Sequence, residues 1–225
     1  MPNIPPVTRQ IAVTVDVVLL TLLAGRLQVL LMRRGREPFR DQLALPGGYI
    51  HPQEDDDALA AARRVLLDKT GVRAPYLEQL YTYANGARDP RGWSVSITFY
   101  ALVSEQALRR TGHEVFELLA ADALPRLSFD HNRIVDTALD RLRNKSAYSS
   151  LPCYLLPERF TLTELQQTYE QVMDVALEKS AFRRKLADLD FVEPVPGARQ
   201  VGQHRPAQLY RLKAGARLAV FDRPF

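Results

Sequence analysis

"LALPGGYIHPQEDDDALAAARRVLLDKTGV", residues 43–72, joins a turn, an acidic loop and a helix, and this order decides the fold. The sequence Pro46-Gly47-Gly48 is a strong turn signal. The acidic residues at 54–57 suit a helix N-terminus, because free backbone N–H groups and the helix dipole favour negative charge there. Gly71 suits the position just after a helix, where left-handed backbone is common. The stretch therefore predicts a turn–loop–helix unit that ends at Gly71.

This unit resembles the Nudix signature, G-x5-E-x7-R-E-U-x-E-E-x-G-U, in which U is a bulky aliphatic residue. In that family the helix presents carboxylates at i, i+3 and i+4, which share one face and hold Mg²⁺ against a pyrophosphate. The metal activates water and offsets charge that develops on the phosphorus oxygens. Alignment on Arg64 and Gly71 puts the metal-binding positions at Val65, Asp68 and Lys69.

The substitutions at these positions remove the expected metal chemistry. Valine has no ligand atom, lysine brings a positive charge to where a cation would bind, and the net charge of the three positions changes from −3 to zero. We therefore expect no metal site, no requirement for Mg²⁺ and no catalytic residue in this helix. The resemblance implies a degenerate Nudix box made of Gly48, Asp56, Arg64, Val65, Asp68, Lys69 and Gly71.

The front of the box also departs from the pattern. Counting back from Arg64 places its first acidic residue at Asp56, two residues further from Gly48 than the signature has. Glu54 has the right distance from Gly48 but the wrong distance from Arg64. The acidic run at 54–57 either binds a cation or caps the helix from a solvated loop, and we favour the cap. One alternative stays open: a Nudix hydrolase that uses Glu54, Asp56 and Asp68 as substitute acids.

The order of predicted elements indicates two domains of different kinds. Segments rich in β-branched and apolar residues predict strands at 11–22, 27–32, 76–84 and 94–103. Apolar residues at helical spacing predict a helix over 130–145. A segment with two prolines and several small residues follows. The predicted fold class is α+β, with a Nudix-like α/β/α sandwich at 1–145 and a winged helix-turn-helix domain at 146–225.

A ligand pocket is expected even without the metal. Gly47 and Gly48 allow the backbone to approach a pyrophosphate closely. "RDPRGWSVSITFYALV", residues 88–103, resembles a segment typical of the ADP-ribose pyrophosphatase branch of Nudix proteins, in which Arg88 and Arg91 would meet phosphates bidentately. The aromatic candidates for stacking on adenine are Tyr81, Tyr83 and Trp93. The predicted effector-binding residues are Gly47, Gly48, Tyr81, Arg88 and Arg91.

The C-terminal part predicts a nucleic-acid-binding fold. A capping box at Thr161–Glu164 starts one helix, a second helix covers 179–190, and two strands joined by a long tip follow, as in a winged helix-turn-helix. Cations lie near the start of the second helix and at the strand tip, and together these two clusters would contact double-stranded DNA. One such cluster alone would indicate only a charged surface exposed to solvent. The predicted DNA-binding residues are Lys179, Ser180, Arg183, Arg184, Lys185, Arg199, His204 and Arg205.

Composition narrows the cellular setting. The 225 residues carry a net charge of +4, and residues 194–221 contain no acidic side chain. The single cysteine, Cys153, excludes an internal disulfide framework and fits a reducing compartment. The longest apolar run near the start is too short to cross a bilayer, and no signal-peptide pattern accompanies it. We expect a cytoplasmic protein with no membrane association.

The combination resembles the NrtR family of Nudix-related transcriptional regulators over most of the chain. The segments "LPGGYI", "DPRGWSVS", "FDHNRIVDTALDRLRNK", "FTLTELQQTYE", "KSAFRRKL" and "RPAQLYRL" follow that family's order. The resemblance implies a homodimer that binds a palindromic operator and represses genes of NAD synthesis or salvage. It also implies that the N-terminal domain senses ADP-ribose or a related NAD metabolite, with no required cofactor. The hydrolase with an accessory nucleic-acid-binding module remains the alternative.

Overall fold

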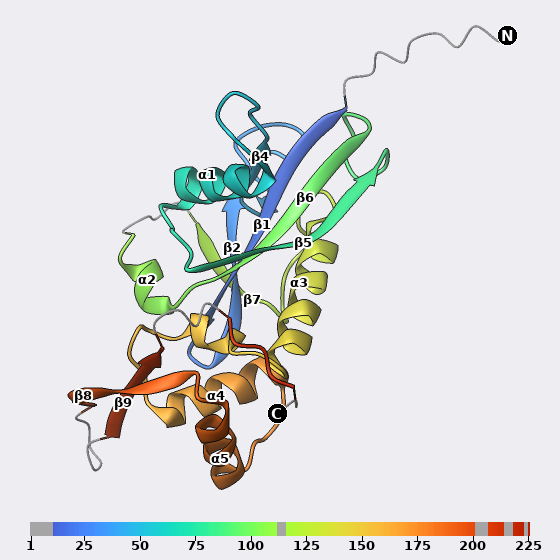
Figure 1. Ribbon diagram of the computed structural model, residues 1–225. Coiled ribbons are helices and arrows are strands. Elements are labelled where there is room, and N and C mark those ends of the chain that lie inside the picture. Colours follow the sequence, from blue (N-terminus) through green and yellow to red (C-terminus); the bar gives the residue numbers. More distant parts are fainter. Residues whose placement is uncertain (1–10, 112–115, 201–206, 214–217, 223–224) are drawn as a thin grey trace, which may run out of the picture.

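The computed structural model describes residues 11–111, 116–200, 207–213, 218–222 and 225, without the side chains of 198–200. Within these residues a seven-stranded sheet in the order β3-β2-β1-β6-β5 forms the N-terminal part, with β4 paired to β1 and β7 paired to β2 (Figure 1). The pairing of β1 with β6 is parallel and the others are antiparallel. The strands are β1 Ala12–Leu23, β2 Arg26–Arg33, β3 Leu43–Ala44, β4 Gly47–Tyr49, β5 Tyr76–Asn85, β6 Ser94–Leu102 and β7 Glu117–Ala120.

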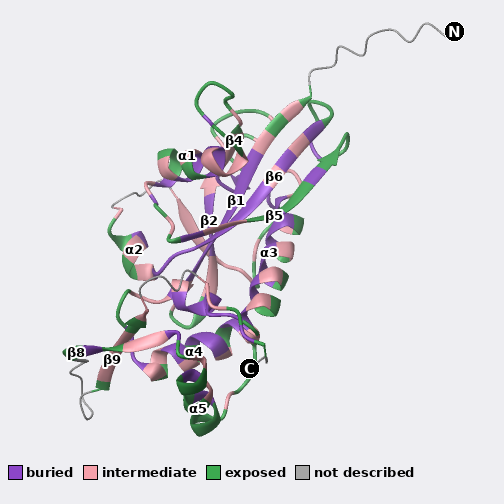
Figure 2. Cartoon of the chain, viewed as in Figure 1, coloured by how far each residue is buried: buried purple, intermediate pink, exposed green. Residues whose placement is uncertain are grey.

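Helices cover both faces of this sheet. Along β1, Val15 and Val17 pack in one apolar cluster with α1 (Ala58–Thr70) and α2 (Glu105–Arg109). The alternate residues of β1, such as Val18, pack in a second cluster with α3 (His131–Ser146). Successive strand residues point to opposite faces, so a strand buried on both sides needs apolar residues throughout. The α/β/α sandwich expected from the sequence is confirmed, and Figure 2 shows the buried centre of β1 and β6.

Local sequence signals explain why the two long helices of the N-terminal part, α1 and α3, form where they do. Asp57 caps α1 by accepting a hydrogen bond from the backbone N–H of Ala60, and Gly71 ends the helix at a φ of 69°. The apolar face of α3 is buried at Ile134, Val135, Ala138, Leu139 and Leu142, as its spacing predicts.

A second unit follows α3. Its elements are a 3-10 helix η1 Leu151–Leu155, α4 Leu162–Met173, α5 Lys179–Leu189, β8 Val192–Gln200 and β9 Ala207–Leu212. The capping box predicted at Thr161 and Glu164 is present, with both of its hydrogen bonds. Two helices followed by an antiparallel pair of strands make the expected winged helix-turn-helix.

The two units share one apolar core. Val172 of α4 and Leu151 of η1 lie in the same buried cluster as the inner face of α3. The hydroxyl group of Tyr169 in α4 donates a 2.7 Å hydrogen bond to the backbone carbonyl of Ser149, just after α3. Cys153 is buried in the core of the second unit, where burial raises the pKa of its thiol. The domain boundary placed after residue 145 stays a prediction.

Some local expectations were wrong. Gly47 and Gly48 form strand β4 against β1 instead of a turn, because their backbone pairs with Val15 and Asp16. In β6 the polar residues Ser94, Ser96 and Thr98 are buried, whereas Val95 and Ile97 between them are only half-buried. Neither α2 nor η1 was predicted, because five residues carry too little periodicity to reveal a helix.

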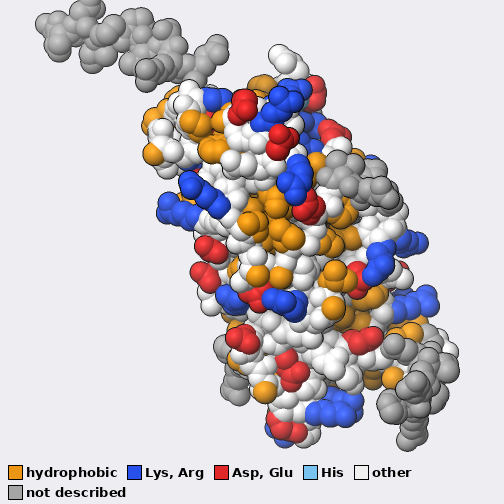
Figure 3. Space-filling model, turned by 180° about the vertical axis from the view of Figure 1, so that it is seen from behind, with side chains coloured by type: hydrophobic (Ala, Val, Ile, Leu, Met, Phe, Trp, Pro, Cys, Tyr) orange, Lys and Arg blue, Asp and Glu red, His pale blue; other side chains and the backbone are white. Residues whose placement is uncertain are grey.

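The surface is mixed in charge. Figure 3 shows lysine and arginine side chains interspersed with aspartate and glutamate over the face opposite to Figure 1. Across the described part of the chain, no helix combines the length and the apolar composition that crossing a membrane requires.

Candidate functional site

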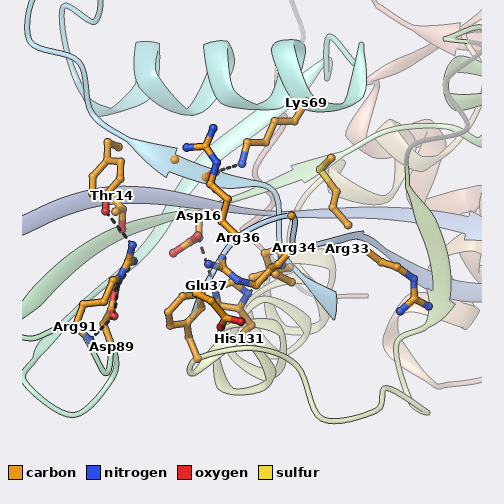
Figure 4. A pocket seen from close by; sticks show the side chains of 18 of the residues that line it. Thr14, Asp16, Arg33, Arg34, Arg36, Glu37, Lys69, Asp89, Arg91 and His131 are labelled. Atoms are coloured by element: carbon orange, nitrogen blue, oxygen red, sulfur yellow. Dashed lines mark hydrogen bonds and ion pairs between the residues drawn. The ribbon is translucent and has the colours of Figure 1, made fainter. Parts of the chain in front are cut away.

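A pocket of about 680 Å³ opens on the α3 side of the sheet, beneath the end of α1 (Figure 4). Six of its lining residues are arginine or lysine and three are aspartate or glutamate, so the pocket favours an anionic ligand. The cations are Arg33, Arg34, Arg36, Lys69, Arg88 and Arg91; the carboxylates are Asp16, Glu37 and Asp89.

Asp16 is the buried carboxylate at the floor of this pocket. Its Oδ2 accepts a 2.5 Å hydrogen bond from Oγ of Ser96. Gly47 lies so close to it that an added Cβ would sit 1.9 Å from Oδ1 of Asp16. The glycine is therefore required here by lack of space.

Arg88 lies in the pocket wall and forms hydrogen bonds with the residue that precedes α3. Its guanidinium donates two hydrogen bonds, of 3.1 and 2.9 Å, to the carboxylate of Asp130, the residue that precedes α3. One of its nitrogens also lies 3.7 Å from Asp16. The Arg88 side chain is only 5% exposed, so it serves first as an internal counter-ion for two carboxylates.

His131 adds a second link between α3 and the pocket. Its Nδ1 accepts a 2.9 Å hydrogen bond from the backbone N–H of Leu45, so the proton of the neutral ring is on Nε2, 3.7 Å from Asp16. Burial lowers the pKa of His131, which keeps the ring neutral near pH 7. The first turn of α3 is thus held against the pocket by two buried polar side chains.

Arg64 pairs with an acidic residue of the loop before α1. Nε and a terminal nitrogen of Arg64 each donate a 2.7 Å hydrogen bond to the carboxylate of Asp55, which also accepts a 2.7 Å bond from the backbone N–H of His51. Asp56, which counting back from Arg64 gives as the first acid of the box, is exposed, and its place in the box stays a prediction. The loop at 51–54 turns back on itself and brings Asp55 inward, an effect that counting along the chain does not capture.

The Asp55–Arg64 pair predicts a pH dependence of stability. The bidentate hydrogen bond from Arg64 lowers the pKa of Asp55 from 3.8 to about 2. Because the folded-state pKa is depressed, the pair stabilises the fold above pH 3.8, and this contribution is lost as the pH falls toward 2. Urea unfolding of the wild type should therefore shift to lower urea over that interval by more than unfolding of Asp55→Asn. Parallel pH profiles for the two proteins would contradict this assignment.

The residues at the three expected metal-binding positions, Val65, Asp68 and Lys69, lie in different environments. Val65 is buried against the sheet, 3.0 Å from where a Cβ on Gly48 would lie. Asp68 is exposed on α1. Lys69 reaches into the pocket and donates a hydrogen bond to the carbonyl oxygen of Gly47 (Figure 4). Among the described residues, no cluster of three or more histidine, cysteine, aspartate or glutamate side chains is arranged to hold a metal ion.

Four of the five residues predicted to bind the effector come together in the pocket: Gly47, Gly48, Arg88 and Arg91. Tyr81 does not line it and is 57% exposed on β5. Of the other aromatic candidates, Tyr83 is buried and donates or accepts a 2.7 Å hydrogen bond with Thr137, and Trp93 is exposed away from the lining. Aromatic lining comes instead from Tyr49 and Phe129.

The loop between β2 and β3 supplies pocket residues that were not singled out. Arg34 lies 4.6 Å from the ring centre of Phe129 and donates a 2.8 Å hydrogen bond to the carbonyl oxygen of Pro38. Arg36 is exposed at the same pocket. The run "RRGRE" at 33–37 could have indicated these cations, because a turn between two strands often carries ligand contacts.

Helix α5 presents a mostly exposed face at the far end of the molecule (Figure 2). Lys179, Arg183 and Arg184 are exposed there. The hydroxyl group of Ser180 donates a 2.6 Å hydrogen bond to Glu178, which caps the helix and whose pKa falls to about 2 through its bonds from Ser180 and Ala181. This face remains the candidate nucleic-acid interface.

Not every predicted contact lies on this face. Lys185 packs over the ring of Phe225, 4.5 Å from its centre, because it follows the buried Phe182 by three residues. Arg211 and Lys213 form ion pairs with Glu193 and Asp190. His204, Arg205 and the side chain of Arg199 lie outside the described residues.

Comparison with known proteins gives the family. A model of the NUDIX domain matches residues 12–138, and a model of the NrtR DNA-binding winged helix domain matches residues 152–212. The "ADPR responsive transcriptional repressor NtrR" of Acinetobacter baylyi is 41% identical over 202 residues, which are 88% of this chain and 80% of the relative. The chain belongs to the NrtR family. The family expected from the sequence is thereby confirmed.

Two solved NrtR structures are similar to this family member. The crystal structure of Shewanella oneidensis NrtR complexed with a 27mer DNA is 36% identical, has a TM-score of 0.88, and covers 95% of this chain and 99% of that one. The NUDIX domain of the same Shewanella protein, complexed with ADP ribose, is 38% identical with a TM-score of 0.55 and covers 62% of this chain and 94% of that one. The protein is thus a homologue of an ADP-ribose-responsive transcriptional repressor.

Proposed function

We propose that the protein is a cytoplasmic, homodimeric repressor that binds a palindromic operator through α5 and the β8–β9 tip, and that ADP-ribose or a related NAD metabolite in the pocket changes its DNA affinity. Genes of NAD synthesis or salvage would be its targets. The pocket favours a diphosphate because its lining carries twice as many cations as carboxylates. Absence of hydrolase activity is part of the proposal, since Val65 and Lys69 occupy positions that would bind metal in a Nudix enzyme.

The observation that carries the proposal is the path of α3. Its first turn lies in the pocket wall, where Asp130 binds Arg88 and His131 receives the N–H of Leu45. Its last turns pack against η1 and α4 in one continuous core. A ligand that alters the pocket therefore acts on an element that directly contacts the DNA-binding unit.

The response would follow from a shift between two arrangements of the units. A ligand that binds one arrangement more tightly raises its population by that difference in affinity, and DNA does the same for the arrangement that it binds. The effects are reciprocal, so operator DNA should change ADP-ribose affinity by the same factor as ADP-ribose changes DNA affinity.

The direct test is a fluorescence titration with DNA from upstream of neighbouring NAD-related genes, with and without ADP-ribose. Specific DNA binding whose affinity changes with ADP-ribose supports the proposal. Binding that does not distinguish this DNA from unrelated DNA, or that ADP-ribose leaves unchanged, contradicts it. Incubation with ADP-ribose and Mg²⁺ followed by detection of AMP tests the hydrolase alternative. Turnover that is abolished by Asp68→Ala would favour that alternative.

Arg183→Ala should weaken operator binding. Its exposed guanidinium near the start of α5 is placed to meet a phosphate, so its loss should lower the slope of log affinity against log salt by about 1. Arg63→Ala, which removes an exposed arginine from α1 at the other end of the molecule, is the matched control and should bind DNA like the wild type. If Arg183→Ala and Arg205→Ala both leave the affinity and the salt slope unchanged, the proposed DNA interface is wrong.

A further inference from the structure

The Nudix fold implies Mg²⁺, but the residues of this chain do not fit the ion. Mg²⁺ is held by carboxylate oxygens and water in near-octahedral geometry. On α1, the buried Val65 offers no oxygen and the exposed Asp68 is a single carboxylate. Lys69 brings an ammonium group to this part of the pocket. Its positive charge would repel a bound Mg²⁺ strongly enough to oppose binding, even in a polar environment.

The Lys69 side chain has the geometry of a built-in counter-ion. Its Nζ donates to the carbonyl oxygen of Gly47, in the strand that forms one wall of the pocket. An ammonium group has three donors, so two remain for a ligand. Among the described residues no carboxylate lies within ion-pair distance of Lys69, which leaves its charge available to a ligand.

The neighbours of Lys69 strengthen its pull on an anion. Figure 4 shows Lys69 and Arg36 both directed into the pocket, from α1 and from the β2–β3 loop. Desolvation lowers the pKa of Lys69, the nearby charge of Asp16 raises it, and the charges of Arg34 and Arg36 lower it further. Lys69 therefore shares this end of the pocket with two arginines, and a diphosphate would bring negative charge to all three.

We propose that the Lys69 ammonium group takes the place of the Nudix metal, so that the pocket binds the diphosphate of its ligand through Lys69, Arg34 and Arg36 without Mg²⁺. This inference rests on the proposed function, because it uses ADP-ribose as the ligand. It goes further by assigning the residues that neutralise the diphosphate and by making binding independent of divalent cations. It also gives the lost catalytic position a present role in ligand affinity.

The test is calorimetric titration of the full-length protein with ADP-ribose in EDTA and again in Mg²⁺. The wild type should bind equally well in both. Lys69→Met, which keeps the apolar stem and removes the charge, should weaken binding about tenfold or more in both conditions, the scale of a lost charged hydrogen bond. Lys69→Arg should recover most of that loss, and a thermal melt checks that each variant is folded.

The matched control is Arg63→Met, which removes an exposed cation from the same helix outside the pocket and should bind like the wild type. A wild type whose affinity collapses in EDTA overturns the inference while leaving ADP-ribose as the effector. A folded Lys69→Met protein with wild-type affinity also overturns it. A wild type that binds no ADP-ribose in either condition overturns the proposed effector as well, so the two failures are distinguishable.

Discussion

Gly47→Ala should destabilise the protein by about 3 kcal/mol or more, at the upper end for overpacking a buried site. The added methyl carbon would lie 1.9 Å from Oδ1 of Asp16, well inside contact distance. Asp16 cannot swing away freely, because the hydroxyl group of Ser96 and the guanidinium of Arg88 hold it from two sides. Urea unfolding followed by circular dichroism measures the loss, and the same variant should lose ADP-ribose binding.

Gly35→Ala is the control for this result. It adds the same methyl group in the same pocket, but no atom lies within 4 Å of the new carbon. Its free energy of unfolding should stay close to that of the wild type. Equal stability of Gly47→Ala and Gly35→Ala would mean that the carboxylate of Asp16 does not lie against Gly47.

Arg88→Met should cost about 3–5 kcal/mol of stability, because it leaves the carboxylates of Asp130 and Asp16 without their shared cation. The Arg88 and Asp130 side chains are 5% and 17% exposed, so water cannot readily replace the lost partner. The variant should also detach the first turn of α3 from the pocket. Chemical unfolding gives the stability, and DNA titration with ADP-ribose shows whether the ligand response is lost.

Two further variants separate charge pairing from loss of side-chain volume. Arg26→Met removes a guanidinium that is 59% exposed and pairs with Asp122, which is itself 65% exposed, so it should cost less than about 1 kcal/mol. Adding Asp130→Leu to Arg88→Met should restore part of the stability by removing one of the unpaired carboxylates. A double variant that is no more stable than Arg88→Met would show that the Arg88–Asp130 pair is not the source of the loss.

Signals that act within a few residues were sufficient to predict most of the fold. The apolar spacing of α3, the capping box of α4 and the terminal glycine of α1 each depend on neighbours less than two turns away. The order of these elements then limits the possible folds. Strands with intervening helices favour a sheet covered on both faces, and two helices followed by two strands favour a winged helix.

The site was less predictable because its contacts join distant segments. Asp55, not Asp56, meets Arg64, and only the folding of the acidic loop decides between adjacent carboxylates. Tyr81 lies opposite Thr98 of β6, which lies opposite Asp16 of β1, so it is level with the pocket but two strands away and does not line it. Lys185 was predicted to contact DNA because of its charge. It follows the buried Phe182 by three residues, and this spacing places the two side chains on the same side of α5.

Helix α3 also has the dimensions of a lever. Its 16 residues span about 24 Å at 1.5 Å per residue. A tilt of about 5° at the pocket end would therefore displace the far end by roughly 2 Å, the size of shift that repacks helices at interfaces. In the proposed homodimer the two α5 helices must enter successive major grooves about 34 Å apart, so opposite tilts in the two subunits would change that spacing by twice the displacement. A sub-ångström adjustment around a diphosphate would thus be amplified along α3, until the spacing of the two α5 helices no longer matches that of successive major grooves.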